Sequence, residues 1–293
     1  TGLTHATGVN LVANERWNFG ASAEYGTLID ALTDAETDRR AVGVRMGFSK
    51  ESVQFTSGVE YRRDNVEQID LARNERTAWL FRNSFRFQLN PDWRIVGKLN
   101  HSFSDSSAGE FFDGGYTEAV LGYAYRPVHH DRFNSLVKFT YFYNFPTAGS
   151  SVDSPPTAGQ VGADNTPADF IQKSCIAAVD ANYDITAKWT IGGKVAYRVG
   201  SISLDRVNPE FFDNTARLGI LRLDWRFLKY WEGMGEARWL DLPDVDQRRF
   251  GALAAIYRYL GEHVKVGAGY NFTDFSRALT DLSYDHQGAF LNA

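Results

Sequence analysis

Apolar and polar residues alternate with a period of two along most of the chain. The segment 77–89 shows this well, because one parity is mainly aromatic and the other mainly polar. Its aromatic positions are Trp79, Phe81, Phe85 and Phe87. A period of two predicts a β-strand, whose successive side chains point to opposite faces. About fifteen such segments of roughly ten residues follow one another, which is the strand length that crosses a bilayer at a tilt.

The connections between these segments also alternate, between short turns and long polar loops. The short turns are 13–16, 49–51, 90–92, 186–188, 228–230 and 261–263. The long loops are 31–40, 65–75, 104–115, 146–169, 204–214 and 241–248. Short turns on one rim and long loops on the other are typical of outer-membrane barrels. We therefore expect an all-β protein, an antiparallel up-and-down transmembrane β-barrel in the outer membrane of a Gram-negative bacterium.

Four tryptophans support a membrane location. Trp17, Trp93, Trp189 and Trp231 each stand just after a short turn. Their indole rings would then lie at one level, where amphipathic rings prefer the membrane–water interface. We expect them to form an interfacial girdle.

Composition narrows the class further. The mean hydropathy is -0.35, and no apolar run approaches the ~20 residues that a membrane helix needs. The net charge of -5 gives no sign of nucleic-acid binding. The single cysteine, Cys175, leaves no intrachain disulfide and is best interpreted as a small apolar residue, buried or facing lipid.

Residues 1–293 are expected to form a single barrel domain, truncated at both ends. The directions of the first and last segments imply an odd number of strands, whereas bacterial barrels have an even number. The last segment also lacks a terminal aromatic residue on its lipid face. We expect sixteen or more strands in the intact protein.

An internal repeat links two hairpins. Residues 93–99 (WRIVGKL) resemble residues 189–195 (WTIGGKV), and each copy is followed by the sequence Glu-Phe-Phe-Asp. The first copy of this loop motif is Glu110, Phe111, Phe112 and Asp113, and the second is Glu210, Phe211, Phe212 and Asp213. The motif could bind a ligand, but we favour phenylalanines that anchor the loops over the rim.

Several stretches resemble a family of proteobacterial barrels that form the C-terminal domain of long multidomain surface proteins. They are 111–115 (FFDGG), 121–127 (LGYAYRP), 240–243 (LDLP), 266–275 (VGAGYNFTDF) and 280–285 (TDLSYD). The resemblance implies an outer-membrane anchor or export domain and brings no catalytic residues. Its implied partners are outer-membrane lipid and lipopolysaccharide, the barrel-assembly machinery, and N-terminal domains of the same polypeptide.

The polar parity predicts a basic lumen, because its arginines and lysines outnumber its acids. The main candidates for lining it are Arg45, Arg82, Arg86, Arg94, Lys98, Lys138, Lys194, Arg198, Arg222, Arg226, Arg238 and Arg258. An open lumen with this wall would favour anions. In a closed lumen the same residues would form cross-strand ion pairs.

The sequence predicts no enzyme, metal site or cofactor. None of the six histidines lies in a nucleophile motif, and the neighbouring His129 and His130 would point to opposite faces of a strand. Two hypotheses remain: an anchor or export domain of a larger surface protein, and a porin-type diffusion channel that prefers anions.

Overall fold

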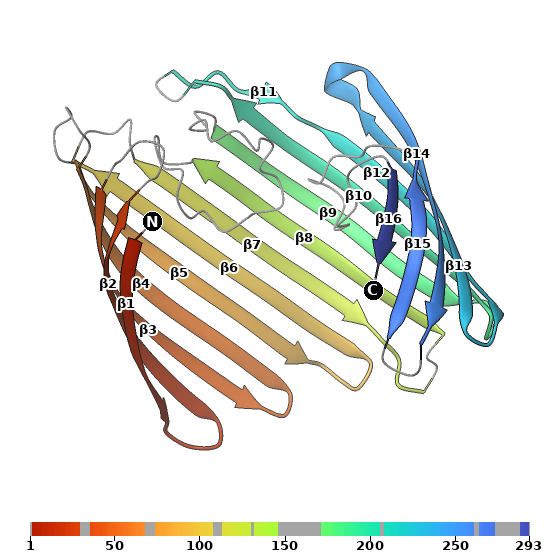
Figure 1. Cartoon of the computed structure of the whole chain (residues 1–293), viewed down its shortest axis with the longest axis horizontal. Helices are drawn as coiled ribbons and strands as arrows, with labels where there is room; N and C mark the ends of the chain where they lie inside the picture. Colours follow the sequence, from red (N-terminus) through yellow and green to blue (C-terminus); the bar gives the residue numbers. More distant parts are fainter. Residues whose placement is uncertain are drawn as a thin grey trace.

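One antiparallel sheet contains most of the described residues in the computed structural model (Figure 1). The structure describes residues 2–29, 36–67, 74–107, 113–129, 132–145, 171–205, 208–260, 264–272 and 288–292. The first eight strands are β1 (Gly2–Val12), β2 (Trp17–Ile29), β3 (Glu36–Lys50), β4 (Val53–Glu67), β5 (Asn74–Gln88), β6 (Trp93–Ser106), β7 (Gly114–Tyr125) and β8 (Phe133–Phe145). The others are β9 (Ile171–Asp184), β10 (Trp189–Ser203), β11 (Phe212–Asp213), β12 (Ala216–Leu228), β13 (Trp231–Leu242), β14 (Gln247–Tyr259), β15 (Lys265–Asn271) and β16 (Gly288–Asn292).

The sixteen strands follow an up-and-down order, and each long strand pairs with its neighbours in the sequence. Only the two-residue strand β11 lies off this path, where it pairs with the end of β10. This order confirms the predicted fold class. Several connections are shorter than expected, because strands extend into the predicted loops 31–40, 65–75 and 104–115. β13 and β14 extend into the predicted loop 241–248, where a 3-10 helix (Pro243–Val245) joins them.

Three of the short turns share a side-chain cap that the residue types explain. Asn14 Oδ1 accepts hydrogen bonds from the backbone N–H groups of Arg16 and Trp17, at 2.9 and 3.0 Å. Asn90 and Thr186 make the equivalent pair of bonds in their own turns. Asn and Thr favour turns because their side chains bind the backbone two or three residues ahead. Each cap fixes the residue that begins the next strand.

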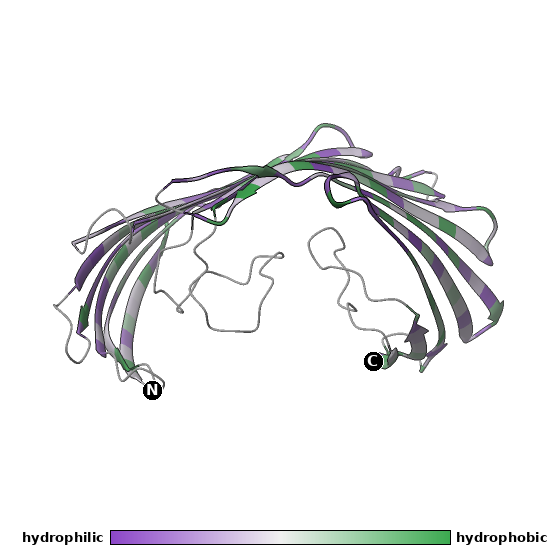
Figure 2. Ribbon diagram, turned by 90° about the horizontal axis from the view of Figure 1, so that it is seen from above, coloured by the Kyte–Doolittle hydropathy of each residue, from purple (hydrophilic) through white to green (hydrophobic). Residues whose placement is uncertain are grey.

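The sheet is curved into an arch, along whose strands hydrophilic and hydrophobic residues alternate (Figure 2). The strand register joins one parity into an apolar row that crosses ten strands. The row is Val53, Phe87, Ile95, Tyr123, Val137, Val179, Val195, Gly219, Trp239 and Phe250. Most of its side chains are exposed, as shown by Val195 at 66% and Phe250 at 72%. Side chains diverge on the outside of a curve and keep their accessible surface, so this is the convex face.

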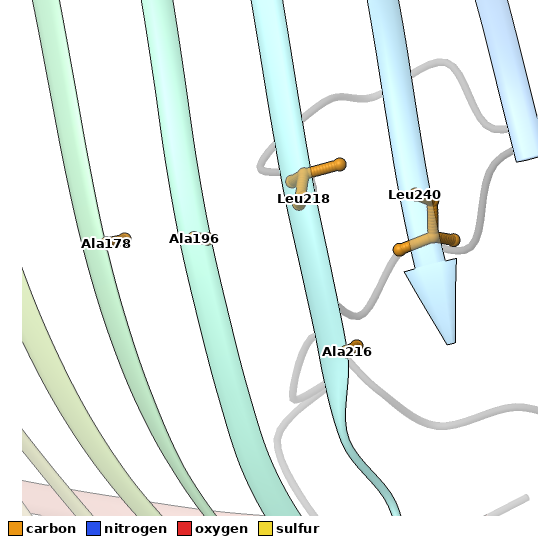
Figure 3. Packing of buried hydrophobic residues seen from close by; sticks show 5 residues of the cluster. All are labelled: Ala178, Ala196, Ala216, Leu218 and Leu240. Carbon is orange, nitrogen blue, oxygen red and sulfur yellow. The ribbon is translucent and has the colours of Figure 1, made fainter. Parts of the chain in front are cut away.

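The opposite parity carries the most deeply buried residues and therefore forms the concave face. Ala178, Ala196, Leu218 and Leu240 make a continuous row across β9, β10, β12 and β13, with Ala216 beside Leu218 (Figure 3). The sequence predicts a polar concave face throughout, and the structure corrects this for two apolar clusters, the row just described and Leu253, Ala255 and Tyr257 in β14. Polar and basic residues prevail on the concave face of β3 to β6.

No helix in the described part of the chain is both long and apolar enough to cross a membrane.

Candidate functional site

The predicted interfacial tryptophans occupy one rim of the convex face. Trp17, Trp93, Trp189 and Trp231 are the first residues of β2, β6, β10 and β13. Each contacts another ring or a cation on the same face: Phe48 lies at 4.7 Å from Trp17, Tyr125 at 4.3 Å from Trp93, and Trp225 at 5.1 Å from Trp189, measured between ring centroids. Such an aromatic belt suits the boundary between hydrocarbon and water.

Arg258 belongs to this rim and not to the concave face. It is the register partner of Trp231, and its guanidinium carbon lies 5.3 Å from the centroid of that indole ring. The assignment to the lumen is therefore corrected. The cause is local, because both parities of β14 are mainly apolar and only the pairing with β13 decides which one faces inward.

The other eleven predicted lumen residues lie on the concave face. They are Arg45, Arg82, Arg86, Arg94, Lys98, Lys138, Lys194, Arg198, Arg222, Arg226 and Arg238. The repeat places two of them alike, since Lys98 and Lys194 occupy the same position in β6 and β10.

Acidic residues on the same strand or on nearby strands compensate part of this charge. Glu60 in β4 binds Arg62 at 2.9 Å and Arg82 at 3.6 Å, and Glu118 in β7 binds Lys98 at 2.7 Å. Towards the C-terminal edge the pairs are Arg222–Asp224, Arg226–Glu232, Arg238–Glu236 and Lys265–Glu232. The pairs between neighbouring strands, such as Lys98–Glu118 and Arg226–Glu232, stabilise the sheet and help to fix its register.

A buried ion-pair network lies at the loop end of the concave face. The Arg39 guanidinium donates two hydrogen bonds to the Asp64 carboxylate, at 3.0 and 3.2 Å, and Arg76 approaches the same carboxylate at 3.4 Å. The three residues are register partners on β3, β4 and β5. Sequence reasoning missed them because they fall in or beside segments predicted to be loops, whereas the strands continue through those segments.

Three concave arginines are held by neutral amides. The pairs are Arg45 with Asn10, Arg94 with Gln88, and Arg198 with Asn214. An amide oxygen orients a guanidinium but does not neutralise it, so these positive charges remain uncompensated by their partners.

Arg94 has a second basic residue beside it. Arg86 on β5 is the register partner of Val96, two positions along β6 from Arg94. Arg86 is exposed, and within the described ranges no carboxylate is bonded to it. We call Arg86 and Arg94 the concave arginine pair. Two adjacent uncompensated guanidiniums can bind carboxylate or phosphate groups.

The loop motif is described only in part. Glu110, Phe111 and Phe112 lie outside the described residues, while Asp113 accepts a hydrogen bond from the backbone N–H of Ser106 at 2.7 Å. In the second copy all four residues are exposed: Phe212 and Asp213 form β11, and the ammonium of Lys173 lies 4.1 Å from the ring centroid of Phe211. Glu210 precedes this contact without a described bond.

No cluster of three or more His, Cys, Asp or Glu residues able to hold a metal occurs in the part of the chain that the structure describes. Cys175 is a free thiol on the convex face, beside Val199 and Tyr141 in the register.

An apolar convex face, an aromatic rim and a charged concave face on an up-and-down antiparallel sheet define the fold of an outer-membrane β-barrel. A sheet of this kind lies in the outer membrane of a Gram-negative bacterium.

Solved structures share this fold. Over 92% of the chain it is similar to the copper transporter OprC, with a TM-score of 0.54 and 10% identity. Over 99% of the chain it is similar to the ferric yersiniabactin uptake receptor FyuA from Yersinia pestis, with a TM-score of 0.51 and 12% identity. The chain spans about half the length of these two proteins, 51% and 52%. No protein-family model and no curated protein matches the sequence.

Proposed function

We propose that the chain forms part of the wall of an outer-membrane transport barrel whose basic concave face favours anionic solutes. The observation that carries the proposal is the concave arginine pair, Arg86 and Arg94, whose charge no described carboxylate compensates. Rings of basic side chains are the usual means of anion preference in pores.

Two further points support transport. Barrels of sixteen or more strands enclose either an aqueous channel or a lumen closed by a plug. Two of the solved structures with a similar fold are a copper transporter and a ferric yersiniabactin uptake receptor. We propose no catalytic step for this chain.

A second candidate is the anchor or export domain of a larger surface protein. The resemblance of residues 266–275 to barrels of that kind favours it. In that case the concave charges would serve to hold the sheet register through ion pairs such as Lys98–Glu118. A porin-type channel is the third possibility, and it differs from gated uptake in being open at rest.

The test has two arms, both with the folded protein. In a planar bilayer under a salt gradient, the current and its reversal potential report conduction and ion preference. In detergent, isothermal titration with citrate reports binding of a polyanion even if the lumen is closed. The variant is Arg86→Gln with Arg94→Gln, and the matched control is Arg217→Gln with Arg248→Gln, which removes two arginines from the convex face.

Steady current with anion preference that the concave variant abolishes would identify a porin-type channel. Citrate binding without steady current, lost in the concave variant and kept in the control, would identify gated uptake. A silent bilayer with no citrate binding would overturn the transport proposal and leave the anchor or export domain.

A further inference from the structure

Two arginines face each other directly on the convex face. Arg40 in β3 and Arg63 in β4 are register partners, and both side chains are exposed. Like charges directly opposite each other on a sheet are destabilising. We call these two residues the convex arginine pair.

The pair lies immediately beyond the apolar belt, on the side of the long loops. The next convex pair towards the short turns is Val42 with Tyr61, and the Tyr61 ring lies 5.0 Å from that of Trp79. Strands β3 and β4 have 15 residues each, whereas about 9–11 residues suffice to cross a bilayer. The convex arginine pair is therefore at the level of the lipid head groups of the outer leaflet.

Neighbouring acids do not bridge the two guanidiniums. Glu75 in β5 binds Arg63 from the far side, at 2.5 Å, and Asp38 accepts a hydrogen bond from Thr27 at 2.8 Å. Arg40 lies over the Tyr25 ring, 5.7 Å from its centroid, and no described carboxylate is bonded to it. The positive charge of Arg40 is therefore not neutralised by a described carboxylate.

A second pair of arginines on the same face shows the contrast. Arg217 in β12 and Arg248 in β14 also lie just beyond the apolar belt, which continues there as Trp239 and Phe250. Asp241 on the intervening strand binds both, at 3.5 and 3.1 Å. We call these three residues the Asp241 triad. In the Asp241 triad a carboxylate of the chain lies between the two arginines. In the convex arginine pair no described carboxylate lies between Arg40 and Arg63.

We propose that Arg40 and Arg63 bind the phosphate of a lipopolysaccharide-type lipid in the outer leaflet. Guanidinium groups bind phosphate through paired, charge-assisted hydrogen bonds. A phosphate between the two arginines would remove their repulsion, and the acyl chains of the same lipid would lie against Tyr61 and Trp79. The proposal concerns the lipid face and does not depend on the transported solute.

The experiment measures the affinity of the folded protein in detergent for lipid A bearing two phosphates, by native mass spectrometry. The variant Arg40→Gln with Arg63→Gln is expected to weaken binding by about tenfold or more, the effect of losing at least one charge-assisted contact. The control Arg217→Gln with Arg248→Gln removes the same charge from the Asp241 triad and is expected to change the affinity less than about twofold. Heat-modifiable migration in gels shows that each variant is folded.

Two results would overturn the proposal. One is equal loss in both double variants, which would mean that only the overall charge matters. The other is unchanged affinity in the first variant. If that variant does not fold, the native protein decides the question: it must bind lipid A at least about tenfold more tightly than the same lipid stripped of phosphate.

Discussion

Replacing Asp64 with Asn should destabilise the sheet more than the loss of any single exposed charge. Asp64 is 1% exposed and its partner Arg39 is 5% exposed. The substitution keeps the shape of the side chain but leaves two guanidiniums, those of Arg39 and Arg76, around a neutral amide. Breaking a buried ion pair by removing one partner costs about 3–5 kcal/mol, mainly because the remaining charge stays buried.

Urea unfolding of the protein refolded in lipid vesicles measures this cost, with heat-modifiable migration as the readout. With a slope of about 2–3 kcal/mol per molar urea, the midpoint should fall by about 1–2.5 M. The double variant Arg39→Met with Asp64→Leu should recover most of the loss, because it removes both charges together. A midpoint in Asp64→Asn within about 0.3 M of the native value would refute the reasoning.

Three further predictions concern other positions. A methyl group on Gly97 would collide with the Phe85 ring, so Gly97→Ala should lower the free energy of unfolding by about 1–3 kcal/mol. The control Gly235→Ala should not change it measurably, because no atom lies within 4 Å of the added methyl group. Equal urea midpoints in the two variants would contradict the packing argument. Asn90→Ala removes the acceptor of two turn hydrogen bonds, at 3.0 and 2.9 Å, and should lower the free energy of unfolding by about 1 kcal/mol. Asn90→Asp keeps the acceptor, so its urea midpoint should stay near that of the native protein. A similar loss in both variants would count against the capping role. Glu75→Gln removes the carboxylate that competes for Arg63, so lipid A should bind more tightly in native mass spectrometry, and weaker binding would speak against a phosphate site.

The fold, and the position of the four tryptophans at the start of their strands, could be predicted because each rests on a local and repeated signal. Period-two alternation determines strands, and the order of short and long connections determines the direction of each strand. Trp17, Trp93 and Trp189 follow the same kind of turn, in which an Asn or Thr side chain caps the backbone. These signals need no knowledge of distant contacts.

The remaining features depend on register, which alternation alone leaves open. Arg258 could not be placed because β14 is mainly apolar on both parities. Arg39 and Asp64 lie where strands run on beyond the bilayer, and a polar sequence there resembles a loop. The row from Ala178 to Leu240 is apolar on the concave face, where polarity alone predicts the opposite. Each case was decided by cross-strand pairing between residues far apart in sequence.

The central claim is that the concave face meets water and the convex face meets lipid. Arg86 and Phe87 are adjacent in β5 and test it directly, since they lie on opposite faces. In a background with Cys175→Ser, which removes the only native thiol, Arg86→Cys and Phe87→Cys are exposed in turn to a charged, membrane-impermeant thiol reagent in intact vesicles. The reagent is expected to label Cys at position 86, whereas Cys at position 87 is expected to be protected until detergent is added. Protection at position 86 with labelling at position 87, or equal labelling at both, would contradict it.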